Sequence, residues 1–292
     1  MNRFLLAGLV LLFASSCSRD LDSQTTDVDA DKTLVPVRVH VTDFSVSQED
    51  FPGTRATALG EFSDINTVTL AFYNGDTEVY KTTQTNNEAN FGDFSLSLPM
   101  DSYTMVVVAY RVSASTSFTL TSATEAAYSG DHAFDTFVKK QTVTITTIDA
   151  VDISATLDRV VSLLKVVSTD GKTADVTNVR MTLSAGGRSF NPSTGLATSN
   201  TGFANTVGNS QPVGSTSESL TYLFLATDEQ TMDVTIETLD NNQDVVRSTT
   251  VTNVPFKRNR KTILTGAMYT NSGVAGAFLV STDWLDPLNA DF

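Results

Sequence analysis

The sequence predicts an all-β protein, because strand-like patterns recur along it while runs with helical periodicity are nearly absent. Val, Thr, Ser and Asp are abundant, and turn residues separate short runs of alternating apolar residues. The 292 residues, 40% of them hydrophobic, suffice for one large or two ordinary domains. The formal net charge of −14 argues against nucleic acid or an anionic membrane face as a partner.

The first residues are similar to a bacterial lipoprotein signal. Arg3 precedes ten apolar residues, 4–13, which are too few to span a bilayer as a helix. Small residues lead to Cys17, although Ala14 stands where such signals usually have leucine. Cys17 is the single cysteine, so it cannot form an intramolecular disulfide, and acylation would give it a role. We expect a signal peptide over 1–16 and an acidic flexible tether over 17–33. A plain signal peptide with Cys17 near the cut by chance is the alternative.

Residues 34–56 predict a first strand followed by an exposed loop. The inward face would carry Val35, Val37, Val39 and Val41, alternating with Pro36, Arg38 and His40. A Pro-Gly turn at residues 52–53 and Arg55 follow, and exposed loop tips of this kind are where proteases cut. The segment is either an ordinary edge strand with a solvated arginine, or a removable strand with a processing site.

Further strands are expected in the remainder of a first β-sandwich domain, 34–155. They are residues 66–73, 78–83, 91–98, 103–110, 118–120 and 142–148. The run 103–110 (YTMVVVAY) is apolar throughout, as in a strand buried on both faces. Residues 151–168 fit either one long strand or a strand followed by a short helix over 158–167; we favour the long strand.

A second domain, 156–292, repeats this kind of pattern without a clean internal repeat. Its expected strands are residues 176–183, 221–226, 232–238, 245–251, 261–270 and 277–284. Residues 240–242 (DNN) would be the turn of a hairpin, and residues 186–218, rich in Ser, Asn and Gly, would form a long loop.

Three motifs carry a family resemblance, and the third is a C-terminal block of three parts. They are Arg55-Ala56 ahead of residues 68–75 (VTLAFYNG), then residues 157–160 (LDRV), 254–259 (VPFKRN), 262–266 (TILTG) and 280–284 (VSTDW). With these motifs the chain resembles the fimbrillins, the shaft subunits of type V pili on some Gram-negative bacteria. It is shorter than the best-known shaft fimbrillins, and its second-domain loops depart from theirs.

The resemblance implies a lipoprotein of the outer membrane and cell surface, built from two transthyretin-like β-sandwiches in tandem. It implies that an arginine-specific or trypsin-like protease cuts between Arg55 and Ala56. The strand that carries Val35, Val37, Val39 and Val41 would then be displaced. A strand from another pilus subunit would fill the groove, and the polymer would contribute to adhesion. Phe278, Val280 and Trp284 belong either to the second core or to the donor strand.

No catalytic constellation is visible, and we expect no enzyme, cofactor or metal site. His40 and His132 are the only histidines, and no nucleophile elbow, zinc-protease motif or phosphate-binding glycine loop occurs. Residues 27–31 and 240–242 are acidic but lack the spacing of a calcium loop. Three other roles stay open: an uncleaved pilus anchor, a tip adhesin that uses residues 186–218, and a glycan-binding surface lipoprotein.

Overall fold

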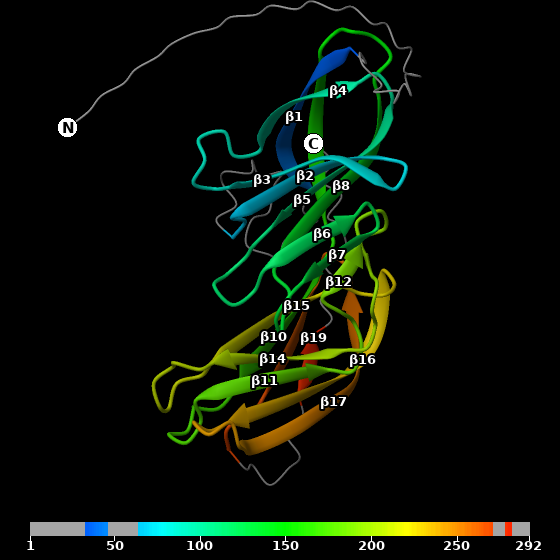
Figure 1. The fold of residues 1–292 in the computed structure, drawn as a ribbon. Coiled ribbons are helices and arrows are strands. Elements are labelled where there is room, and N and C mark those ends of the chain that lie inside the picture. Colours follow the sequence, from blue (N-terminus) through cyan, green and yellow to red (C-terminus); the bar gives the residue numbers. More distant parts are fainter. Residues whose placement is uncertain (1–32, 46–63, 271–277, 282–292) are drawn as a thin grey trace, which may run out of the picture. The chain divides into compact units, whose positions relative to one another are not determined.

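Every regular element in the described part of the chain is a β-strand (Figure 1). The computed structural model describes residues 33–45, 64–270 and 278–281, and nineteen strands lie in these ranges. The all-β prediction is therefore confirmed. No helix among these residues is long and apolar enough to cross a membrane.

The first nine strands build one large sheet and one hairpin. The strands are β1 (Leu34–Ser45), β2 (Thr67–Asn74), β3 (Thr77–Thr85), β4 (Asp93–Pro99), β5 (Ser102–Tyr110), β6 (Phe118–Ser122), β7 (Glu125–Tyr128), β8 (Thr136–Thr144) and β9 (Val151–Arg159). Seven of them form a sheet in the order β3-β2-β5-β8-β9-β1-β4. The hairpin of β6 and β7 extends, through pairing of β7 with β12, into a separate four-stranded sheet.

Eight of the ten later strands form two further four-stranded sheets, and β12 and β13 complete the sheet of β6 and β7. The ten strands are β10 (Ser162–Ser168), β11 (Asn178–Leu183), β12 (Ser189–Asn191), β13 (Leu196–Ala197), β14 (Phe203–Gly208), β15 (Glu218–Leu223), β16 (Glu229–Leu239), β17 (Val245–Lys257), β18 (Lys261–Gly266) and β19 (Leu279–Ser281). One sheet has the order β15-β10-β18-β19 and the other β14-β11-β16-β17. Residues 240–244 form the turn of the predicted hairpin, where Asp240 Oδ1 accepts hydrogen bonds from the backbone N–H groups of Asn242 and Asp244.

Three hydrophobic clusters fill the space between these sheets. Cluster 1 includes the inward side chains of β1, β2, β4, β5, β8 and β9, and cluster 2 those of β10, β11 and β15 to β18. Cluster 3 joins side chains from both regions, among them Tyr128, Phe190 and Phe224. Alternate residues of β5 enter clusters 1 and 3, which is why its sequence is apolar throughout. The predicted division at residues 155 and 156 stays a prediction.

Three predictions of individual elements are wrong. Residues 151–168 are neither one strand nor a helix, because β9 and β10 belong to different sheets and the chain must turn at Val160 and Val161. Residues 186–218 are not a plain loop: they contain the short strands β12, β13 and β14, which pair with their neighbours. The strand expected at 142–148 begins earlier, as β8, because residues 136–144 pair with β5.

Asp170 anchors the backbone that follows β18. Its carboxylate accepts hydrogen bonds from the backbone N–H groups of Met268, Tyr269 and Thr270, at 2.7, 2.9 and 2.7 Å, and from the Thr270 hydroxyl. Partial burial would raise the pKa of this carboxyl, but the four hydrogen bonds favour the charged form and lower the pKa below its ordinary value. The charged carboxylate therefore stabilises the fold.

We expect Asp170→Asn to lower the free energy of unfolding at neutral pH by about 1–2 kcal/mol. Because the folded-state pKa is lowered, this stabilisation is fully present above the unfolded pKa of about 3.9 and is lost as the pH falls through the folded pKa. Urea unfolding of both chains between pH 7 and pH 2 measures the difference. Asp175→Asn, at an exposed position, is the matched control and should change little. A difference that does not shrink in acid would contradict the assignment.

Candidate functional site

The first strand of the chain is inserted between two later strands. β1 pairs antiparallel with β4, from Leu34 opposite Pro99 to His40 opposite Asp93, and parallel with β9 on its other side. In the described residues, β1 is the only strand that pairs with β4 (Figure 1). Removing β1 would therefore leave a slot one strand wide, with unpaired backbone groups on β4 and β9.

The inward face of β1 is buried in cluster 1. Val35, Val37 and Val39 are fully buried and Val41 is 8% exposed. A β-bulge follows Val41, after which Phe44 lies opposite Leu157 and is also fully buried. Full burial of a side chain of this size is worth roughly 1.5–3 kcal/mol, so the five together stabilise the strand by more than about ten times the thermal energy before entropy costs.

Among the described side chains, the outer face of β1 makes two ion pairs, and both are exposed. Arg38 Nη1 lies 3.5 Å from Asp152 Oδ1 on β9, and His40 Nδ1 lies 2.7 Å from Asp93 Oδ1 on β4. All four side chains are more than 40% exposed. Such surface pairs are typically worth at most about 1 kcal/mol. Apolar burial and the two backbone ladders therefore provide most of the stabilisation of β1 in its slot.

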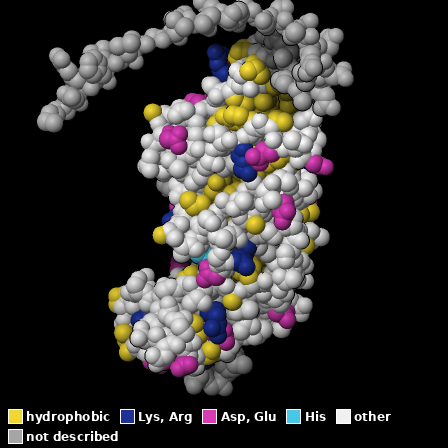
Figure 2. All heavy atoms as spheres, viewed as in Figure 1, with side chains coloured by type: hydrophobic (Ala, Val, Ile, Leu, Met, Phe, Trp, Pro, Cys, Tyr) yellow, Lys and Arg dark blue, Asp and Glu magenta, His cyan; other side chains and the backbone are white. Residues whose placement is uncertain are grey.

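Figure 2 shows hydrophobic side chains gathered on the surface where β1 and β4 lie. Leu34, the first residue of β1, is 60% exposed, and Met100, the residue after β4, is 44% exposed. Leu34 is the register partner of Pro99, so these residues adjoin one another at the end of the slot. We call Leu34, Pro99 and Met100 the apolar rim.

A buried ion pair stands at the other end of the slot. Arg159 donates from Nε and Nη2 to the two carboxylate oxygens of Asp135, each at 2.9 Å, and the two side chains are 0% and 4% exposed. The Arg159 guanidinium lies 4.7 Å from the centroid of the Phe137 ring. The centroid of the Phe44 ring lies 4.3 Å from that same centroid. Burial raises the pKa of the Asp135 carboxyl, and the charge and hydrogen bonds of Arg159 oppose that rise.

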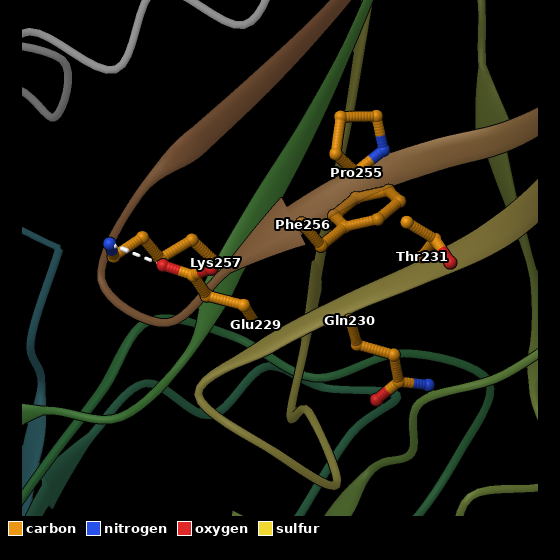
Figure 3. Close-up of a pocket in the computed structure, with 6 residues that line it drawn as sticks. All are labelled: Glu229, Gln230, Thr231, Pro255, Phe256 and Lys257. Carbon is orange, nitrogen blue, oxygen red and sulfur yellow. Dashed lines mark hydrogen bonds and ion pairs between the residues drawn. The ribbon is translucent and has the colours of Figure 1, made fainter.

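One surface pocket offers few groups for chemistry. It holds about 510 Å³ on the β16–β17 hairpin, lined by Glu229, Gln230, Thr231, Pro255, Phe256 and Lys257 (Figure 3). Lys257 Nζ pairs with Glu229 Oε1 at 2.5 Å. The Gln230 amide accepts a hydrogen bond from Ala226 N–H and donates one to Asn200. The polar side chains of Glu229, Gln230 and Lys257 are thus engaged in structural bonds. Among residues that the structure describes, no three His, Cys, Asp or Glu side chains are grouped to hold a metal ion.

Comparison with known proteins places the chain in a family. Residues 37–287 match the model of a family of unknown function, DUF6562. The chain belongs to the DUF6562 family. No curated protein matches it in sequence.

Solved structures show that the fold of this DUF6562 protein is shared with candidate adhesins of Bacteroides. A candidate adhesin of Bacteroides ovatus aligns over 89% of the chain and 96% of its own length, with 9% identity and a TM-score of 0.53. A candidate adhesin of Bacteroides thetaiotaomicron aligns over 86% and 96%, with 9% identity and a TM-score of 0.52. The fimbrial anchor protein Mfa2 of Porphyromonas gingivalis aligns over 85% and 95%, with 11% identity and a TM-score of 0.48. The two structures with TM-scores above 0.5 show that the chain shares the fold of these candidate adhesins.

The predicted site residues of the DUF6562 chain fall into two groups. Cys17, Arg55, Ala56 and Trp284 lie outside the described residues. The slot is filled by Val35, Val37, Val39 and Val41 of β1, whereas Phe278 and Val280 pack with cluster 2. The sequence motif LDRV included Arg159, but nothing in the sequence indicated its pairing with Asp135, 24 positions earlier.

We expect Arg159→Met to destabilise the DUF6562 chain by about 3–5 kcal/mol, because the substitution leaves the Asp135 carboxyl buried without its partner. Replacing both residues, as Arg159→Met with Asp135→Leu, should restore much of the loss. Urea unfolding of the single and double variants measures both effects. The matched control is Arg180→Met at the half-buried pair with Glu237, which should cost about 1 kcal/mol or less. A loss no larger than in the control would show that the buried pair is unimportant.

Proposed function

We propose that this DUF6562 protein is a structural subunit of a cell-surface fimbria that assembles by strand exchange. The observation that carries the proposal is the place of β1: the first strand of the chain is the sole strand partner of β4 in the described residues. The two adhesin-like Bacteroides structures that share the fold at TM-scores above 0.5 support a role at the cell surface.

In the proposed pathway the chain is exported as a lipoprotein acylated at Cys17 and reaches the outer membrane. An arginine-specific or trypsin-like protease cuts between Arg55 and Ala56. Because β1 precedes this position, one cut separates both the lipid and the strand from the rest of the chain. A strand from another subunit then fills the slot, and two transthyretin-like domains per subunit build the shaft.

The energetics of β1 favour exchange over simple loss. The buried side chains of β1 are together worth roughly 7–15 kcal/mol before entropy costs. A typical domain has a total stability of about 5–15 kcal/mol. A chain that lost β1 without replacement would therefore be close to unfolding, and its slot would bind another strand by backbone pairing. No step needs catalysis by the subunit, a cofactor or a metal.

Limited trypsin digestion of the purified chain that starts at Ser18 tests the processing site. We expect a cut after Arg55, found by N-terminal sequencing, followed by a ladder of oligomers on a denaturing gel. Arg55→Ala should abolish both, whereas Lys32→Ala, which removes a cleavage position ahead of β1, should abolish neither. A stable monomer after complete cleavage at Arg55 would contradict assembly, and an uncut monomer would favour the anchor, adhesin or glycan-binding roles.

A reversible disulfide tests whether β1 must leave its slot. Arg38 and Ser95 are register partners on β1 and β4, and both are exposed. With both replaced by cysteine and oxidised, the chain should still be cut after Arg55 but should form no ladder until a reductant is added. The matched control replaces Thr235 and Thr250, whose hydroxyls lie 2.9 Å apart across β16 and β17. That bond should not affect the ladder; assembly of the oxidised Arg38–Ser95 variant would refute strand displacement.

A further inference from the structure

The slot of β1 ends in an aromatic pocket that the alternating valines do not predict. After Val41, which pairs with Ala155, an extra residue is inserted, so that Phe44 rather than residue 43 lies opposite Leu157. The bulge keeps Phe44 on the inward face, because side chains of an unbroken strand alternate strictly. Phe44 is fully buried there.

One wall of this pocket is the ring of Phe137, and the Arg159–Asp135 ion pair holds it in place. The ring centroids of Phe137 and Phe44 lie 4.3 Å apart, with an interplanar angle of 44°. The Arg159 guanidinium lies against Phe137 and is held in turn by both oxygens of Asp135. Because a buried bidentate pair has one favourable geometry, the ring of Phe137 is kept in place and presents a rigid aromatic face. A rigid wall penalises a side chain that is too small, since the resulting cavity cannot collapse.

We propose that the slot selects its incoming strand by a large aromatic side chain placed opposite Leu157. This inference rests on the proposed strand exchange and names the chemistry of the partner. The partner is a strand of another subunit with β-branched residues at alternate positions, as Val35, Val37, Val39 and Val41 are arranged. Its aromatic residue stacks on Phe137 at the end of the slot nearest the Arg159–Asp135 pair.

The pocket recognises an aromatic side chain that lies opposite Leu157, whatever the number of residues between it and Val41. A strand that lacks Thr42 has no bulge, yet its phenylalanine falls two places after Val41 and again faces Leu157. A strand with Phe44 and Ser45 exchanged has the same composition, but its phenylalanine moves to the opposite face. These two strands separate recognition of the pocket position from general hydrophobicity.

The test uses the full chain from Ser18 with a specific protease site placed within residues 46–63 and cut. Fluorescent synthetic strands then compete with the retained β1, and fluorescence anisotropy reports entry. We expect the native strand 34–45 and the strand without Thr42 to enter with similar affinity. Phe44→Ala and the Phe44–Ser45 exchange should bind about 30-fold more weakly or worse. Equal affinity of the native and Phe44→Ala strands would overturn the proposal.

Failure of strand exchange itself gives a different result. If even the native strand never enters the cut chain, β1 is not removable, and the proposed function fails. The pocket is then tested by urea unfolding of the uncut chain. Phe44→Ala should lower the urea midpoint more than Val41→Ala does. Phe44→Leu should lower it less than Phe44→Ala. A loss with Phe44→Ala no larger than with Val41→Ala would overturn the pocket.

Discussion

The insertion of β1 between β4 and β9 is the constraint on which the larger sheet depends. β4 has no other strand partner in the described residues, and β9 pairs with β8 over only two positions. β1 therefore completes a sheet whose other six strands all follow it in the sequence. Its stability comes from buried valines, because its outward ion pairs are exposed and weak.

The same strand is connected to the region where the two halves of the chain meet. Phe44 contacts Phe137, Phe137 contacts Arg159, and Arg159 binds Asp135 just ahead of β8. Val160 and Val161, directly after Arg159, enter cluster 3 together with Phe190 and Phe224 of the second half. A series of contacts therefore connects Phe44 in the slot with Arg159, which directly precedes two residues of cluster 3.

Local patterns in the sequence were enough to find strands such as β1, which faces water on one side, and β5, which is buried on both. In β1 the alternation is complete because Pro36, Arg38 and His40 are outward, and β5 is apolar throughout because it separates two clusters. The pattern failed at β12 and β14, which are too short and too mixed in composition to show an alternation and are recognised by their backbone pairing. It also could not give the Arg159–Asp135 pair, which depends on strand order, nor the bulge that turns Phe44 inward.

A removable strand has to satisfy two opposing requirements. It must be bound strongly enough to support folding before it is cut, and it must leave no covalent or deeply buried polar bond that would hold it afterwards. Among the described side chains of β1, the buried contacts are apolar and the ion pairs, at Arg38 and His40, are on the surface. Apolar contacts do not depend on the identity of one partner, so a new strand can reproduce them. What distinguishes one strand from another is then the fit of single large side chains, and in this slot the site that demands such a fit is the aromatic pocket opposite Leu157.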